Sequence, residues 1–159
     1  MKEENKTKKQ LISELLDLRC GVASFEALET SIADRKQVEE RLKESEEKYR
    51  VLIEESLQGL VITQGIPPRL VFVNPAMTKI LGYTSEELTA LSPKEIEGLL
   101  YPEDRKVFFE RYRDRLEGKP ALPLYDIRGI RKDGTVIWLE LSSTRIEYKG
   151  APAVQATFL

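Results

Sequence analysis

The sequence has no histidine in 159 residues. Imidazole serves as the base in Ser-His-Asp and Cys-His catalysis, as a ligand in ordinary zinc sites and as a common axial ligand of haem. These roles, together with phosphohistidine chemistry, are therefore excluded within this chain. We expect no catalytic residues and no metal site here.

The sequence also has only one cysteine, a net charge close to zero and no long apolar run. The single cysteine, Cys20, cannot form an internal disulfide, and 25 basic against 27 acidic side chains leave a net charge of −2. A balance so close to neutral does not predict a nucleic-acid partner. No apolar run approaches the roughly 18 residues that span a bilayer, and the first ten residues lack the apolar stretch of a signal peptide. The sequence therefore predicts a cytoplasmic protein that does not insert into membranes.

Residues that interrupt helices are concentrated in the second part of the chain. All eight prolines lie at or beyond Pro67, and eight of the nine glycines lie at or beyond Gly59. Charged residues make up 33% of the chain, above the roughly 25% of an average domain. We predict a charged helical arm or linker over residues 1–48, followed by a globular domain over residues 49–159.

The predicted arm carries apolar residues at the spacing of a coiled coil. Steps of four and three place a stripe along one side of a helix, and charges of both signs are interleaved around it. We expect two copies to pair through this stripe as a homodimer, with parallel pairing as the natural inference. The alternative is that the stripe folds back on the chain's own domain. The stripe comprises Leu11, Leu15, Leu18, Val22 and Phe25 and, after an interruption, Val38, Leu42, Ser45, Tyr49 and Leu52.

The interruption lies between Ile32 and Val38. Ile32 continues the first part of the stripe, and Val38 begins the second part six residues later, where a heptad repeat requires seven. We expect a local irregularity there, in one long helix or between two. Two registers of similar energy could be exchanged at such a point, which would make the arm a two-state element.

The domain has the pattern of an α+β fold, with an antiparallel sheet whose one face is covered by helices. Short β-branched runs end at turn residues, among them Asp133-Gly134, and Asn74-Pro75 and Ser92-Pro93 are typical helix starts. The predicted strands are 59–64, 70–74, 124–132, 136–148 and 153–159, and the predicted helices are 75–81, 84–88, 92–98 and 102–117.

Several segments, in this order, resemble the PAS domain family, the small sensor modules of two-component and related signalling proteins. DRKQVEERLKESEEKYR (34–50) is similar to the helical linker that leads into such domains in sensor kinases. RKDGTVIWLELSS (131–143) resembles the strand pair called the PAC motif. The other matching segments are EEKYRVLIEESLQGLVI (46–62), VNPAMTKILGYTSEEL (73–88) and YPEDR (101–105).

The resemblance implies a strand order of 2-1-5-4-3, with helices over one face that enclose a small pocket. It also implies a last strand that continues into Asp-Ile-Thr and an output helix. Because this sequence stops at Phe158-Leu159, we expect the last strand to be truncated and the output domain to be absent.

The resemblance also bears on cofactors. PAS domains that bind haem commonly use a histidine, and those that form a flavin photoadduct need a cysteine in the helix after the second strand. This chain has no histidine, and its one cysteine, Cys20, lies in the arm. Histidine-ligated haem and cysteinyl-flavin photochemistry are therefore excluded, while non-covalent flavin stays open and the cofactor is unknown.

Alternation in the long strands predicts which side chains face the pocket. Leu139 and Leu141 point to one side of the sheet, and Trp138 and Glu140 point to the other. The alternative is ordinary core packing, because a domain of this size needs such residues for its core. Gly129 could open space for a ligand or mark a bulge. The candidate pocket residues are Met77, Ile80, Leu81, Tyr83, Phe108, Ile127, Gly129, Leu139 and Leu141.

Acidic and basic residues near these strands have structural interpretations. Glu103 and Asp104 suit the positive N-terminal end of the helix over 102–117. Asp126, Arg128 and Glu140 are interpreted as a solvated set of charges across neighbouring strands, in preference to a ligand clamp. Tyr101 stands where the family usually has a histidine, so pH sensing by that histidine is lost.

These observations predict a sensor and dimerisation module of a signal-transduction protein, in the first instance a two-component histidine kinase. A stimulus in the domain would alter the geometry of paired helices. One alternative is a ligand-free dimerisation or spacer module, and another is the PAS domain of a diguanylate cyclase-type regulator. A small-molecule ligand is compatible with the first hypothesis, and the sequence does not identify it.

Overall fold

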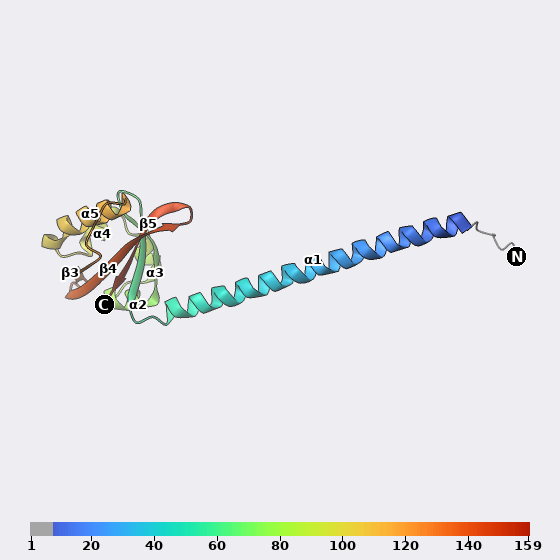
Figure 1. Ribbon diagram of the computed structural model, residues 1–159. Coiled ribbons are helices and arrows are strands. Elements are labelled where there is room, and N and C mark those ends of the chain that lie inside the picture. Colours follow the sequence, from blue (N-terminus) through green and yellow to red (C-terminus); the bar gives the residue numbers. More distant parts are fainter. Residues whose placement is uncertain (1–7) are drawn as a thin grey trace. The chain divides into compact units, whose positions relative to one another are not determined.

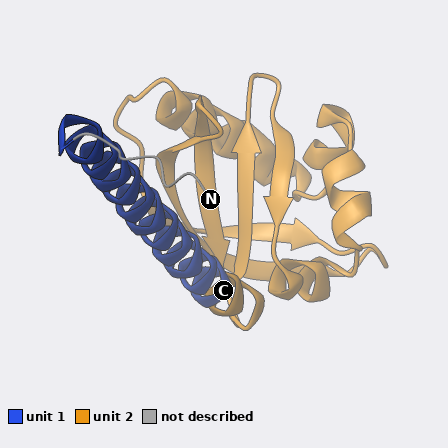
Figure 2. Ribbon diagram, turned by 90° about the vertical axis from the view of Figure 1, so that its right-hand side faces the viewer, with its two compact units in different colours: residues 1–49 blue, residues 50–159 orange. Residues whose placement is uncertain are grey.

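The computed structural model describes residues 8–159 (Figure 1). Residues 1–7 of the predicted arm lie outside the described residues. The chain divides into two units, residues 1–49 and residues 50–159, which are coloured separately in Figure 2.

A single helix, α1 (Lys8–Glu54), occupies the arm. The helix continues without a break through residues 32–38, so the irregularity expected there does not interrupt the helical backbone. Every residue from Lys8 to Leu52 is exposed, including those of the apolar stripe. Seven residues of the stripe are expected to form the dimer seam, and their exposed fractions range from 48% at Leu11 to 67% at Leu18; the others are Leu15, Val22, Val38, Leu42 and Tyr49. Across residues 8–159, no helix has the length and apolar character that crossing a membrane requires.

Five antiparallel strands form one sheet in the order β2-β1-β5-β4-β3, which confirms the order that the family resemblance implied. Long β4 pairs with β3 on one side and β5 on the other, and β1 joins β5 to β2. The strands are β1 (Gly59–Gln64), β2 (Arg69–Val73), β3 (Leu124–Ile130), β4 (Val136–Tyr148) and β5 (Ala151–Phe158).

Two strand ends differ from prediction by two residues, and three others, both ends of β2 and the end of β5, differ by one. β3 ends two residues before Lys132, since the backbone N–H groups of Arg131 and Gly134 already form the turn to β4. β5 begins at Ala151, two residues early, because Lys149 and Gly150 both have positive φ and form a two-residue hairpin turn.

Four helices lie between β2 and β3 in the chain, and each begins with proline or follows a capping hydroxyl. The Thr84 and Ser92 side chains each accept a hydrogen bond from the backbone N–H three residues later, which fixes the starts of the second and third of these helices, α3 and α4. The last helix ends one residue before the predicted Glu117. They are α2 (Pro75–Leu81), α3 (Ser85–Ala90), α4 (Pro93–Gly98) and α5 (Pro102–Leu116).

The hydrophobic core lies between these helices and one face of the sheet. In β4 the burial alternates as predicted: Leu139 and Leu141 are buried, whereas Trp138 is 70% exposed on the other face. The largest fully buried apolar side chains are Leu88 from α3, Ile127 from β3 and Leu141 from β4.

Candidate ligand-binding site

An apolar cavity with a volume of about 70 Å³ lies within the core of residues 50–159. Every strand of the sheet and each of α2–α5 contributes to its lining. One enclosed water needs roughly 10–15 Å³, a cavity of roughly 150 Å³ holds benzene, and pockets for drug-sized ligands exceed roughly 300 Å³. The cavity therefore suits a few waters or a ligand of a few non-hydrogen atoms, and it is smaller than a flavin or a haem requires.

Seven of the nine residues proposed from the sequence line this cavity, and two do not. Ile80 and Tyr83 are partly buried and pack against the core instead. Ile80 approaches the start of β1, where its Cδ1 lies 3.0 Å from the position of a Cβ on Gly59. The residues that line the cavity are Met77, Leu81, Phe108, Ile127, Gly129, Leu139 and Leu141.

Gly129 lines the cavity, and the strand ladder runs through it without a bulge. The backbone of residues 99–101 comes close to β3 on both sides of this glycine. The N–H of Ile130 donates to the Leu99 carbonyl at 2.8 Å, and the N–H of Tyr101 donates to the Arg128 carbonyl at 2.9 Å. A Cβ at position 129 would lie 3.1 Å from Cδ1 of Leu139, so a larger residue would fill space beside the cavity.

The polar part of the lining was not predicted from the sequence. It comprises Thr63, Tyr112, Arg115, Tyr125 and Ser143. The signal for Ser143 was present, because it continues the alternation of Leu139 and Leu141 by one step. Arg115 was hidden because a charged residue is rarely assigned to a buried helix face. In the structure Arg115 is 7% exposed and Leu116 is partly exposed.

Two of the polar side chains are already engaged with the backbone. The Tyr112 hydroxyl donates to the Gly65 carbonyl at 2.9 Å, and the Thr63 hydroxyl donates to the Val154 carbonyl at 3.2 Å. Burial raises the pKa of the Tyr112 hydroxyl, so it stays protonated and remains a donor at neutral pH. These bonds tie α5 to the turn after β1 and β1 to β5.

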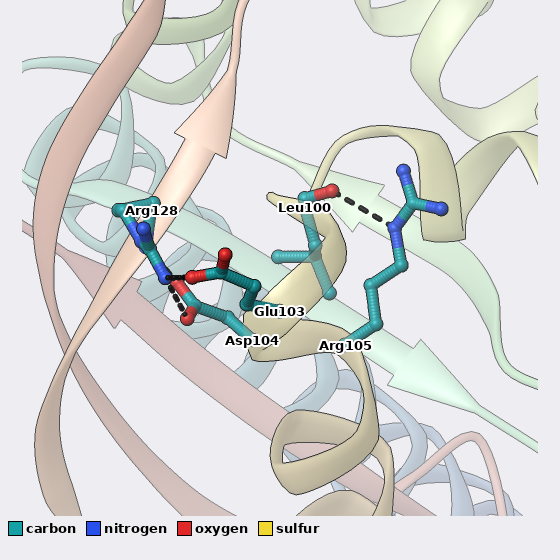
Figure 3. A network of polar contacts seen from close by, with 5 residues as sticks. All are labelled: Leu100, Glu103, Asp104, Arg105 and Arg128. Carbon is teal, nitrogen blue, oxygen red and sulfur yellow. Dashed lines mark hydrogen bonds and ion pairs between the residues drawn. The ribbon is translucent and has the colours of Figure 1, made fainter.

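A cluster of ionic contacts joins the start of α5 to β3, as Figure 3 shows. The Arg128 guanidinium donates to the two Asp104 carboxylate oxygens at 3.0 and 2.7 Å, and to Glu103 at 3.0 Å. These hydrogen bonds hold the pKa of Asp104 below its usual range. Arg128 therefore pairs with acidic residues of α5. The expectation that it belongs to a solvated set of charges across the strands was wrong, although Asp126 does lie opposite Glu140 in the β3–β4 register.

Tyr101 lies outside the cavity lining and contacts this cluster. The Arg128 guanidinium carbon lies 4.1 Å above the centroid of the Tyr101 ring and 5.4 Å from that of Trp138. A cation over an aromatic face is attracted by the ring quadrupole. The tyrosine that replaces the family's usual histidine thus supports the contact between α5 and β3.

Asn74 connects the last turn of α1 with the core. Its side chain is fully buried and donates to the carbonyls of Ile53 at 3.2 Å and Gln58 at 2.9 Å. The Oδ1 atom accepts from the N–H of Leu60 at 2.8 Å and of Met77 at 3.1 Å. One side chain therefore satisfies backbone groups from the helix end, from β1 and from α2, and both β1 and α2 contribute to the cavity lining.

A family model described as PAS fold matches residues 70–157. A curated relative, the sensor histidine kinase TmoS of Ectopseudomonas mendocina, is 31% identical over 98 residues, which cover 62% of this chain and 10% of the relative. This chain thus spans about a tenth of that relative's length.

Solved structures share the fold. A domain of a sensory box sensor histidine kinase/response regulator from Geobacter sulfurreducens superposes with a TM-score of 0.56 at 21% identity, over 73% of this chain and 95% of that chain. The PAS domain of an HTR-like protein from Haloarcula marismortui gives a TM-score of 0.58 at 19% identity, over 78% and 98% of the two chains. Together with the family match, which covers more than half of the sequence, these findings show that the chain belongs to the PAS fold family.

Proposed function

We propose that this chain is the sensing and dimerisation module of a cytoplasmic two-component sensor histidine kinase. The family match and the relationship to a sensor histidine kinase support a signal-sensing module. The kinase activity would reside in other parts of the parent protein. A small molecule in the cavity is the stimulus, and α1 is the element that responds.

The contacts of Asn74 carry this proposal. The bond from Asn74 to the Ile53 carbonyl fixes the last turn of α1 to a residue that also holds β1 and α2. A ligand that shifts α2 or β1 therefore changes the position of a group bonded directly to the helix. Because packed cores move between discrete arrangements, a small shift here can select between two helix geometries.

Pairing of α1 supplies the second part of the mechanism. The stripe from Leu11 to Leu52 leaves large apolar side chains exposed in the single chain. A parallel two-stranded coiled coil removes these side chains from water, since each fits between four residues of the facing helix. In the dimer, the two paired helices then respond together to ligand binding in the cavities of the two chains.

The native cysteine allows a matched cross-linking test of this pairing. Cys20 is exposed and lies two residues from both Leu18 and Val22, which places it on the side of the helix away from the seam. We would oxidise the double variant Leu18→Cys/Cys20→Ser beside the unchanged protein, and measure the oligomer size by analytical ultracentrifugation. A parallel dimer predicts rapid disulfide formation through position 18 and slow formation through Cys20.

Two results would contradict the pairing. The first is a monomer at tens of micromolar protein, and the second is cross-linking at equal rates through positions 18 and 20. Either result would leave the stripe without its proposed partner.

A ligand-free dimerisation module is the second candidate, and the small volume of the cavity favours it. Native mass spectrometry separates the two functions, because it reports subunit number and bound mass together. A dimer that releases a small molecule on denaturation supports sensing, whereas a dimer that remains empty after exposure to candidate ligands supports the spacer.

A further inference from the structure

The cavity lining includes a buried cation. Arg115 lies on α5 with 7% of its surface exposed, and it lines the cavity. No aspartate or glutamate is part of the lining. A buried charge is costly unless a partner of opposite charge or several hydrogen bonds compensate it.

The compensation that the chain itself provides to Arg115 is incomplete. Its Nη2 atom donates to the Leu122 carbonyl, and its side chain also donates to the Tyr125 hydroxyl. A guanidinium has five N–H donors. Within residues 8–159 no carboxylate lies at ion-pair distance from Arg115, whereas Arg128, which is less buried, has two.

Ser143 provides a second, independent observation in the same lining. Its hydroxyl oxygen is buried and has no hydrogen-bond partner among the described residues, and the residue is 7% exposed. It points to the same side of β4 as Leu139 and Leu141, which places the hydroxyl on the cavity side. Such a group loses its hydration without replacement, so a ligand that bonds to it removes an existing cost.

Two consecutive residues, Leu122 and Pro123, are hydrogen-bonded to Arg115 and to Ser143. The Leu122 carbonyl accepts from the Arg115 side chain, and the Pro123 carbonyl accepts from the Ser143 N–H at 2.9 Å. Tyr125 follows on β3, where the positive charges of Arg115 and Arg111 act to lower the pKa of its hydroxyl. Burial nevertheless raises the pKa of that hydroxyl, so it stays protonated and can donate.

We propose that the cavity binds a short-chain monocarboxylate, with the carboxylate at Arg115 and Ser143 and the alkyl tail among the leucines of β4 and α2. This inference rests on the proposed function, because it names the ligand class of the sensing site. The carboxylate supplies the missing negative charge and accepts from the serine hydroxyl. The apolar remainder of the lining excludes water from the tail.

The cavity volume selects the length of the ligand. About 70 Å³ is roughly half of the volume that holds the six carbons of benzene. By this comparison the cavity holds about three or four non-hydrogen atoms, so acetate fits closely and butyrate, with six, fits only if the lining expands. Longer acids require the helices to move outward.

The test uses the full chain and isothermal titration calorimetry with sodium butyrate. Butyramide serves as the matched neutral probe because it has nearly the same shape and no charge. We expect butyrate to bind at least tenfold more tightly than butyramide, since hydrogen bonds to a charged group are stronger than those to a neutral one. Acetate and hexanoate give the dependence on chain length, and hexanoate should bind more weakly than butyrate.

Two variants assign the binding to the proposed groups. Ser143→Ala removes the unpartnered hydroxyl, so it should leave the free protein as stable as before or more stable while weakening butyrate binding about threefold to tenfold. Arg115→Met keeps the length of the side chain without its charge and should weaken binding by more than tenfold. Opposite effects of Ser143→Ala on thermal stability and on affinity would not arise from a purely structural role.

The outcomes separate this inference from the proposed function. Equal binding of butyrate and butyramide, no heat from either at tens of millimolar, or unchanged butyrate affinity in Ser143→Ala would overturn the carboxylate site. If Arg115→Met fails to fold, the serine variant still decides the question. Cross-linking through position 18 does not depend on any ligand, so a failed titration with a cross-linked dimer rejects the ligand class alone.

Discussion

The side-chain amide of Asn74 donates to the carbonyl oxygen of Ile53, 21 residues earlier in the chain, at 3.2 Å. The last carbonyls of a helix have no partner within it, so the end of α1 depends on such external donors. Asn74 also caps α2 through the N–H of Met77. The end of one helix and the start of another therefore share a single fully buried side chain.

Replacing Asn74 by alanine should lower the free energy of unfolding by about 3 kcal/mol. The change leaves the backbone groups of Leu60, Met77 and Gln58 without this partner; the bond to Met77 is buried and the other two are partly buried, and a buried loss costs about 1–3 kcal/mol before local rearrangement. Urea unfolding followed by circular dichroism measures the difference.

Ser92→Ala is the matched control for Asn74→Ala. Ser92 caps α4 in the same way, but it is exposed, so its loss should cost about 0.5–1 kcal/mol. Equal destabilisation by the two substitutions would show that Asn74 acts only as a local cap and does not hold the end of α1.

Gly59→Ala should destabilise the domain by about 1–3 kcal/mol through overpacking. A Cβ at this position would lie 2.6 Å from Sδ and 3.3 Å from Cα of Met77, which is itself buried. Gly98→Ala, the control, has open space around its Cβ and sits at the end of α4, where alanine should be neutral or stabilising by about 0.5 kcal/mol. Thermal unfolding of both variants tests the prediction, and an unchanged melting temperature for Gly59→Ala would refute it.

Asp104→Asn should remove stability at neutral pH and have less effect in acid. The pKa of Asp104 is lowered by its bonds to Arg128, so its contribution is complete above about pH 4 and is lost as the pH falls through the lowered pKa. We expect a loss of about 1–2 kcal/mol at pH 7 that shrinks steadily below pH 4.

Urea unfolding at a series of pH values tests the Asp104 prediction. Glu110→Gln on the exposed side of α5 is the control, and it should change stability little at any pH. A difference between Asp104→Asn and the unchanged protein that stays constant down to pH 2 would contradict the ion pair with Arg128.

Tyr112→Phe should cost about 1 kcal/mol, because it leaves the Gly65 carbonyl without the phenol that donates to it at 2.9 Å. Tyr49→Phe removes an exposed hydroxyl from α1 and should leave the melting temperature unchanged. Tyr112 also lines the cavity. Because the variant keeps the aromatic ring and loses only the hydroxyl, it should lose stability without losing the fold. Equal melting temperatures for the two variants would show that the Tyr112 bond adds no net stability.

Much of the local structure followed from short-range chemistry. Asn74, Ser92 and the Asp133-Gly134 turn lie where the sequence pattern predicts, because caps and turns depend on residues within a few positions of each other. The alternation of β4 likewise identified Leu139 and Leu141 as inward-facing. The order of the strands came from the family resemblance, since periodicity alone does not say which strands become neighbours.

The polar contacts of the site depended on tertiary packing. Arg128 pairs with Glu103 and Asp104, 25 and 24 residues away, because α5 starts beside β3. Side-chain spacing within one strand suggested a different set of partners, as it carries no information about where a helix packs.

The sequence by itself determined the apolar stripe of α1, the inward-facing side of the sheet and the absence of histidine chemistry, all of which are properties of residue type and spacing. Only the tertiary structure decided that Arg115 and Ser143 share a cavity. The physical reason is that burial of a polar group depends on what packs around it from distant segments, and here α5, β3 and β4 converge from separate parts of the chain.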